Sequence, residues 1–178
     1  MRLFTAIPFP EEIKNKVSQL MRGRLPVSYI NTTNLHITLN FFGELDSDEE
    51  ERVKSVFLKV AQNFKKFPIE FHEVVKFRQQ VHLTLKPNNS LNELQKNLEK
   101  QFVSAGFNFQ ERDYYAHIKL ASLHMDQVMN QGRKLENFPN QLLSELNFIA
   151  DKIVLYESKL LMHHAHHTPL MEIPLYEA

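Results

Sequence analysis

The chain contains the same order of segments twice. Each half reads strand, helix, strand, helix, strand, because apolar residues alternate in the strand-like segments and recur every three to four residues in the helical ones. We therefore predict an α/β (α+β) fold of two β-α-β-α-β halves related by a pseudo-twofold axis, with mainly antiparallel sheets lining a central cleft. The segments are 2–9, 11–23, 29–45, 47–64 and 68–77 in the first half, and 81–89, 90–106, 108–123, 125–138 and 147–158 in the second.

The repeat also sets the expected domain organisation. With 178 residues, the chain is long enough for one compact domain that buries most of its apolar side chains. We predict a single bilobal domain over residues 1–178, with lobe one at approximately 1–80, lobe two at approximately 81–160 and a C-terminal hairpin at 160–178. Pro169 and Pro174 place this hairpin at a sheet edge, because proline cannot donate a ladder hydrogen bond.

Composition excludes several classes of protein. Lys plus Arg and Asp plus Glu both number 21, so the formal charge is zero and no long basic surface for duplex nucleic acid is expected. The absence of Cys rules out a disulfide scaffold and thiolate metal ligands. No signal peptide or stretch of roughly 18 apolar residues is evident. We expect a cytoplasmic monomer that does not bind membranes.

Three strand-like segments carry a His-x-(Thr/Lys)-Leu pattern: HITL at 36–39, VHLTL at 81–85 and HIKL at 117–120. VHLTL occupies the first strand of its half, where LFTAI stands in the other half, whereas HITL and HIKL occupy second strands. The spacings agree, since 33 residues separate Leu3 from His36 and 35 separate His82 from His117. The repeat therefore predicts that His36 and His117 form a pair.

This pair suits acid–base chemistry on a phosphate. Residues i and i+2 of a strand share a face, so His36 lies beside Thr38 and His117 beside Lys119. Imidazole titrates near pH 6.5, so one ring can activate water while the other protonates a leaving oxygen. Thr38 and Lys119 are then candidates for contacts with the non-bridging phosphate oxygens. The scheme requires no metal and no cofactor.

Two other histidine groups have simpler interpretations. We expect His82 and Thr84 to be structural or solvated rather than catalytic, although their polar face could contact substrate. The sequence HHAHH at 163–167 offers closely spaced imidazoles, but no carboxylate or Cys stands nearby to complete a metal site. We expect HHAHH to form a solvated hairpin loop near the cleft that gains positive charge below about pH 6.5.

Several segments together resemble a known family. RLFTAIPFP at the start, NLHITLNFFGE in the first half, AHIKLAS in the second half and IVLYES followed by HTPL are similar to the LigT-like 2H phosphoesterases. These are bacterial RNA 2',3'-cyclic phosphodiesterases, also described as 2'-5' RNA ligases. The resemblance spans residue 2 to about 170. NLHITLNFFGE carries it most specifically.

The resemblance implies a bilobal fold with two HxTx motifs and an activity. That activity is hydrolysis of RNA 2',3'-cyclic phosphate ends to 2'-phosphates, with 2'-5' ligation as a possible reverse reaction. Its partner would be RNA with a 2',3'-cyclic phosphate or 2'-phosphate end. The resemblance assigns His36 as proton donor to the leaving 3' oxygen and His117 as proton acceptor from water.

The sequence departs from the family pattern after the second histidine. Lys119 stands in place of the motif Thr, and Ser122 stands where many relatives carry Arg. One hypothesis is that Lys119 supplies the phosphate contact of both, with Ser122 close to the substrate. The competing hypothesis is that the second site has decayed.

Aromatic residues flank both motifs and are candidates for stacking on a nucleobase. Strand periodicity predicts that Phe42 shares the His36 face and Tyr115 the His117 face, with Phe41 and Tyr114 buried. Two alternative functions remain open. One is a 2H phosphodiesterase acting on a small cyclic nucleotide or ADP-ribose cyclic phosphate, and the other is a protein that binds RNA ends without turnover.

Overall fold

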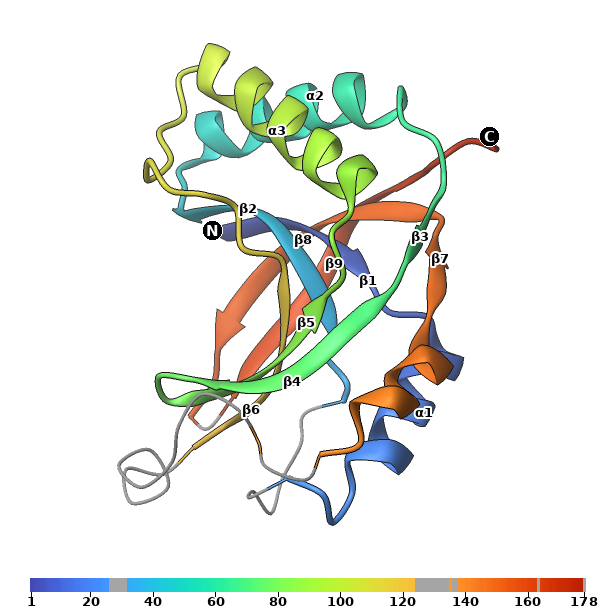
Figure 1. Ribbon diagram of the computed structural model, residues 1–178. Helices are drawn as coiled ribbons and strands as arrows, with labels where there is room; N and C mark the ends of the chain where they lie inside the picture. The colour runs from blue at the N-terminus through green and yellow to red at the C-terminus, as the bar shows by residue number, and fades with distance from the viewer. Residues whose placement is uncertain (26–31, 124–134, 136–137, 163, 178) are drawn as a thin grey trace.

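The computed structural model describes residues 1–25, 32–123, 135, 138–162 and 164–177 (Figure 1). The strands are β1 (Arg2–Pro8), β2 (His36–Glu44), β3 (Phe67–Ile69), β4 (Phe71–Phe77), β5 (Gln80–Leu85), β6 (His117–Ser122), β7 (Phe148–Ala150), β8 (Lys152–Leu160) and β9 (Ala165–Pro174). The helices are α1 (Glu11–Met21), α2 (Ser47–Ala61), α3 (Asn89–Ser104) and the 3-10 helix η1 (Asn140–Leu146). The helix predicted at 125–138 lies largely outside the described residues.

The strands form antiparallel sheets, as the sequence predicts. One sheet has the order β2-β1-β8-β9, a second has the order β4-β5-β6, and a short pair joins β3 to β7. The second sheet combines a strand from before residue 80 with two from after it, and the first combines β1 and β2 with the C-terminal hairpin. The division into sheets therefore does not follow the predicted lobe boundary at about residue 80.

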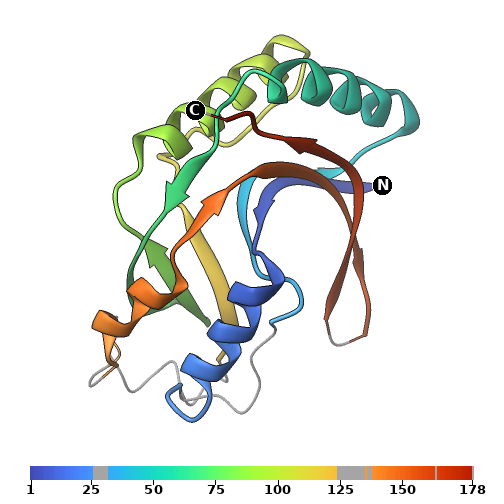
Figure 2. The same cartoon turned by 90° about the vertical axis from the view of Figure 1, so that its right-hand side faces the viewer.

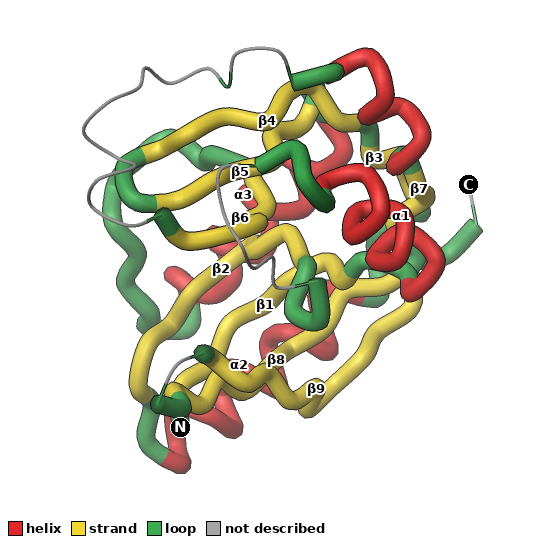
Figure 3. The backbone as a smooth tube through the Cα atoms, turned by 90° about the horizontal axis from the view of Figure 1, so that it is seen from below, coloured by secondary structure: helices red, strands yellow, loops and turns green. Residues whose placement is uncertain are grey.

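The two sheets meet along the strands that begin with His36 and His117. β2 and β6 are terminal strands of their sheets, and Cα atoms of the two approach within 8 Å. Figure 3 shows them next to each other, with β5 beyond β6 and β1 beyond β2. The packing of the sheets thus brings together two motifs that are far apart in the sequence.

Helices cover the sheets at both ends. α2 and α3 lie side by side at one end of the molecule, and α1 and η1 lie together at the other (Figures 1 and 2). Each helix buries the apolar face that its periodicity predicts; in α1 this face is Ile13, Val17, Leu20 and Met21. The buried side chains form a continuous core.

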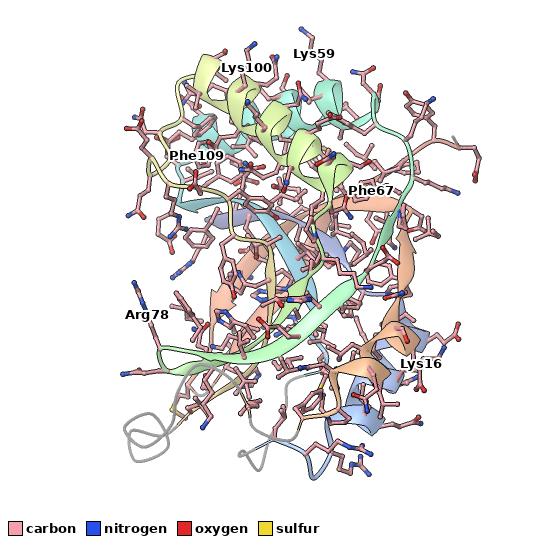
Figure 4. All side chains as sticks on the ribbon, in the orientation of Figure 1. Lys16, Lys59, Phe67, Arg78, Lys100 and Phe109 are labelled. Atoms are coloured by element: carbon pink, nitrogen blue, oxygen red, sulfur yellow. The ribbon has the colours of Figure 1, made fainter. Side chains whose placement is uncertain are left out.

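Polar groups set the ends and the outer faces of the long helices. α2 begins with a capping box in which Asp46 accepts from the backbone N–H of Glu49, and the Glu49 carboxylate accepts from the N–H of Asp46. Asn88 caps α3 by accepting from the N–H of Leu91. Figure 4 shows Lys59 and Lys100 projecting from α2 and α3, away from the sheets.

The C-terminal hairpin is formed by β8 and β9. β9 is an edge strand of its sheet and contains Pro169 and Pro174, which confirms the placement of these prolines at an edge. Asn34 lies in the segment before β2, and its side-chain amide donates to the carbonyl oxygen of Ala165 at 2.7 Å. The start of β9 is therefore anchored beside the first histidine motif.

Candidate active site

The imidazoles of His36 and His117 are held by the same backbone arrangement. Nδ1 of His36 is 2.5 Å from the carbonyl oxygen of Asn34, and Nδ1 of His117 is 2.9 Å from that of Tyr115. Because a carbonyl oxygen can only accept, Nδ1 carries the proton in both rings. In the neutral form, the lone pair is therefore on Nε2, which makes Nε2 the atom of each ring that can exchange a proton with a ligand.

Thr38 and Tyr114 connect the two motifs. The Thr38 hydroxyl is 3.1 Å from Nε2 of His36 and can donate to it when the ring is neutral. The Tyr114 hydroxyl, from the segment before β6, donates to the carbonyl oxygen of Thr38 at 2.7 Å. Burial raises the pKa of Tyr114, so its phenol stays protonated as this bond requires. The hydrogen bond therefore joins the approach to the second motif directly to the first motif.

Each motif strand contains a β-bulge directly after its second polar residue. In β2, Thr38 is opposite Ala6 and Asn40 is opposite Thr5, which leaves Leu39 as the extra residue. In β6, Leu120 is left over in the same way, between Lys119 and Ala121. After Leu120 in β6, and for Asn40 and Phe41 in β2, the alternation of faces is shifted by one residue; a second register shift in β2 then leaves Phe42 as an extra residue.

The bulge in β2 contradicts the predicted face of Phe42. Phe41 is opposite Phe4, whose ring centroid lies 5.0 Å from that of His36, so Phe41 shares the His36 face. Phe41 is 47% exposed, and the guanidinium of Arg2 lies 5.0 Å from its ring centroid. The expectation that Phe41 is buried is therefore wrong as well.

Phe42 packs on the other side of β2. Its ring contacts those of Phe102, Phe107 and Phe109 at centroid separations of 4.7, 5.4 and 5.5 Å, in edge-to-face geometries typical of aromatic cores. This packing beneath α3 gives Phe42 a structural role. We therefore do not carry it forward as a substrate contact.

The corresponding bulge in β6 affects Ser122. Strict alternation would put Ser122 on the face opposite His117, but the extra residue Leu120 returns it to the side of Lys119. Ser122 is opposite Gln80, Lys119 is opposite His82, and both Ser122 and Lys119 are exposed. The face therefore carries His117, Lys119 and Ser122 in order.

Tyr115 lies against the second histidine, as predicted. Its ring stacks on that of His117 with a centroid separation of 4.7 Å and an interplanar angle of 16°. The side chain is 37% exposed and also contacts Phe77. Tyr115 therefore contributes both the carbonyl that fixes Nδ1 of His117 and an exposed aromatic ring beside it.

His36 lies in an aromatic environment that includes a residue the sequence reasoning missed. The ring of His167, from β9, meets that of His36 nearly at a right angle, at 5.4 Å and 87°, and also contacts Phe4 at 4.8 Å. The prediction that HHAHH forms a solvated loop is wrong for its last three residues, Ala165 to His167, which begin β9. The hint in the sequence is the position of His167 at the start of HTPL, in a strand rather than a turn. His163 lies outside the described residues.

Burial lowers the pKa of His36 from 6.5 to about 4. The hydrogen bond to the Asn34 carbonyl opposes this shift, and positive charge on His167, His117 and Lys14 adds to it. At pH 7, His36 is neutral in the unliganded protein.

The pKa of His117 is also lowered, chiefly by burial, with a contribution from the positive charge of Arg112. Its hydrogen bond to the Tyr115 carbonyl opposes the shift. His117 therefore favours the neutral form, with the Nε2 lone pair available to accept a proton. A bound anion near either ring would raise its pKa, because opposite charge stabilises the imidazolium.

The described residues offer neither a cluster of metal ligands nor a membrane-spanning helix. Within them, no group of three His, Cys, Asp or Glu side chains is arranged to hold a metal ion. In that part of the chain, no helix combines the length and apolar character needed to cross a membrane.

Relatives of the chain have names that agree with this chemistry. A protein of Methanocaldococcus jannaschii named RNA 2',3'-cyclic phosphodiesterase is 28% identical over 170 residues, covering 90% of this chain and 92% of its own. A Bacillus subtilis protein of the same name is 26% identical over 126 residues, covering 66% and 69%.

A solved structure has the same fold. Escherichia coli LigT complexed with 3'-AMP superposes with a TM-score of 0.77 at 22% identity, covering 98% of this chain and 97% of LigT. At that identity, the likeness concerns the fold. The family model of the 2'-5' RNA ligase superfamily matches residues 9–160, so the chain belongs to that superfamily.

Proposed function

We propose that the protein hydrolyses RNA 2',3'-cyclic phosphate ends to 2'-phosphates, with His36 and His117 as the acid–base pair. The observation that carries the proposal is the matched fixation of the two rings on neighbouring strands. Each Nδ1–H is held by a carbonyl two residues upstream, which leaves Nε2 for proton transfer. The shared name of several relatives, RNA 2',3'-cyclic phosphodiesterase, supports this substrate class.

The proposed reaction is a single displacement at phosphorus. Nε2 of His117 removes a proton from a water molecule as the water oxygen bonds to phosphorus. The bond from phosphorus to the 3' oxygen breaks, and this oxygen receives the proton on Nε2 of His36. The products are a 2'-phosphomonoester and a 3'-hydroxyl. With the 5'-hydroxyl of a second RNA in place of water as the nucleophile, the same proton transfers would form a 2'-5' phosphodiester and a 3'-hydroxyl, which is a 2'-5' ligation.

His36 must be protonated to act as the acid, although it is neutral in the unliganded protein. With a pKa of about 4, only about one ring in a thousand is charged at pH 7. The cyclic phosphodiester carries a negative charge, and placing it beside Nε2 would raise this pKa. We therefore propose that substrate binding and protonation of His36 are coupled.

Thr38 and Lys119 are the proposed contacts for the non-bridging oxygens. Each follows its histidine by two residues on the same face of its strand. The Lys119 ammonium would offset more charge than the threonine hydroxyl it replaces, since a charge-assisted hydrogen bond is roughly twice as strong as a neutral one. Ser122 and Tyr115 lie further along the same surface and are the proposed contacts for the rest of the nucleotide.

The test is turnover of a short RNA that ends in a 2',3'-cyclic phosphate, followed by 31P NMR. We expect the wild type to produce a 2'-phosphate without an added metal, and His36→Ala and His117→Ala to lose this activity. His72→Ala is the matched control, because His72 is an exposed histidine of β4, a strand that pairs with neither β2 nor β6. Full activity in either catalytic variant would refute the proposed pair.

Three further arms of this experiment separate the alternatives. Preference for free cyclic mononucleotides or ADP-ribose cyclic phosphate over the oligonucleotide would change the substrate class and keep the histidine pair. Tight binding of the RNA end without hydrolysis would favour a binding protein. Hydrolysis that appears only after Lys119→Thr would indicate that the second motif has decayed.

A further inference from the structure

We propose that His82 is a positioning residue that fixes the ring plane of His117 and keeps that ring neutral. The catalytic consequence rests on the proposed function, in which His117 is the base. His82 belongs to β5, directly opposite Lys119, and is only 2% exposed. Its burial removes it from contact with solvent, and its position places it beneath the second motif.

The rings of His82 and His117 are stacked. Their centroids are 4.1 Å apart and their planes differ by 23°. Tyr115 contacts His117 at 4.7 Å and His82 at 5.8 Å, so the three rings form a triangle. Phe77 stacks on His82 at 5.3 Å and 29°. The plane of His117 is thus fixed by two flat rings, one of which is held by a third aromatic ring.

Hydrogen bonds fix His82 in turn. Its Nε2 is 2.7 Å from Oε1 of Gln80, and its Nδ1 is 3.4 Å from the Tyr115 hydroxyl. In the neutral tautomer with a proton on Nε2, His82 donates to Gln80 and accepts from Tyr115. Both nitrogens then lie in polar contacts at the ring edge, and the ring faces are left for stacking.

The stack also favours a neutral His117. Two imidazolium rings at 4.1 Å would repel each other strongly in a partly buried site. Among the described residues, the ionisable groups near His117 include Tyr115 and Arg112 from the preceding segment, Lys119 on β6 and His36 on β2. The positive charge of Arg112 also lowers the pKa of His117. The buried His82 ring covers one side of His117 and so adds to the burial that lowers the pKa of His117.

The second motif differs from the first in the residue that lies opposite it on the neighbouring strand. The residue of β1 opposite Thr38 is Ala6, whereas the residue of β5 opposite Lys119 is His82. Ala6 offers no ring on which His36 could stack. This contrast accounts for the third His-x-Thr segment: His82 acts through His117 and is not a member of the acid–base pair.

The test measures the pKa of His117 by NMR and the pH dependence of kcat/KM. In His82→Ala, solvent reaches His117, so we expect its pKa to rise toward 6.5 and the acidic limb of the profile to move to higher pH. We also expect kcat to fall about tenfold, because small misplacements of a catalytic group are costly. His82→Phe retains a flat ring, and we expect it to restore both readouts to near the wild-type values.

Thr84→Val is the matched control. Thr84 lies on the same strand, and its hydroxyl exchanges hydrogen bonds with the backbone of Glu73 at 3.1 and 3.3 Å. We expect this variant to lower the melting temperature without moving the His117 pKa.

If His82→Ala fails to fold, His82→Leu replaces it, because Leu fills the volume without a flat ring. We expect His82→Leu to have a lower kcat than His82→Phe.

Two outcomes separate this inference from the proposed function. An unchanged His117 pKa and acidic limb in His82→Ala would overturn the positioning role even if His117→Ala is inactive. Equal kcat values in the Leu and Phe variants would do the same. If the wild type does not hydrolyse cyclic phosphates, the proposed function fails, and the NMR titration still decides whether His82 governs His117.

Discussion

The surroundings of His36 and His117 differ more than their backbones do. Both rings donate Nδ1–H to a carbonyl two residues upstream, and both strands bulge after the next polar residue. His36 is packed against Phe4 and His167, whereas His117 contacts the exposed ring of Tyr115 and the buried ring of His82, which also contact each other. The comparison indicates that the backbone sets the tautomer and the packed side chains set the protonation state.

The largest expected effect is that of removing either imidazole, because the proposed reaction requires both His36 and His117. We expect His36→Ala and His117→Ala each to lower kcat by about 1,000-fold, within the range of general acid–base catalysis. Because the two rings act in one step, the double variant should lose little more than either single variant. Single-turnover rates on cyclic-phosphate RNA measure this. Multiplicative losses would mean that the rings work in separate steps.

The next largest expected effects concern Lys119 and Thr38, which each follow a motif histidine by two residues. We expect Lys119→Met to lower kcat/KM by about 10- to 100-fold, since a hydrogen bond to a charged group contributes about 1.5–3 kcal/mol. Thr38→Val should lower it by less than about tenfold, because it removes a neutral hydroxyl. Steady-state kinetics on the same RNA compare the two. A larger loss in Thr38→Val would reverse the assignment of the main phosphate contact.

The effect of a bound anion on the pKa of His36 can be measured without substrate turnover. The pKa of His36 is lowered to about 4 in the folded protein, so adding inorganic phosphate should raise it, and NMR titration would report this shift. Between about pH 4 and pH 6.5, the unfolded chain binds the proton that folded His36 does not. The free energy of unfolding should therefore fall as pH decreases through this window, by at most about 3 kcal/mol from this group.

The control for that titration is His36→Ala, in which the slope of stability against pH should flatten over the same window. Part of the slope will remain, because the pKa values of His117 and His167 are lowered too. A His36 pKa near 6.5 without phosphate would contradict the environment described for this ring.

The smallest expected effect concerns the imidazole that faces His36. Replacing His167 with Phe keeps an aromatic ring against Phe4 and removes one source of positive charge that lowers the His36 pKa. We expect a modest upward shift of the His36 pKa, smaller than the shift caused by phosphate. NMR titration of the variant measures it, and a downward shift would show that His167 stabilises the charged form of His36.

Periodicity predicted a mixed α/β fold with antiparallel sheets, and the internal repeat predicted that His36 and His117 form a pair. The antiparallel sheets, the apolar face of α1 and the edge position of Pro169 and Pro174 are confirmed, because these depend on local patterns. The placement of β2 beside β6 agrees with the predicted pairing, whose role in catalysis stays a prediction. The repeat was informative because its two second strands carry equivalent polar residues.

The failures have specific causes. A β-bulge adds one residue without changing the alternation of letters, so counting by twos placed Phe42 on the wrong face and left Phe41 unrecognised. The contact between His167 and His36 depends on β9 joining the sheet of β1 and β2, a long-range pairing with no local signal. The same long-range pairing joins β8 and β9 to the sheet of β1 and β2.

The hydrogen bond from Tyr114 to the Thr38 carbonyl has a mechanical consequence. It spans the junction of the two sheets close to both imidazoles, so it resists a change in the width of that junction. If it opened, each sheet could keep its own ladder while the gap between the rings widened. Loss of this hydrogen bond would therefore affect the relative position of the two motifs while the ladder of each sheet stays intact.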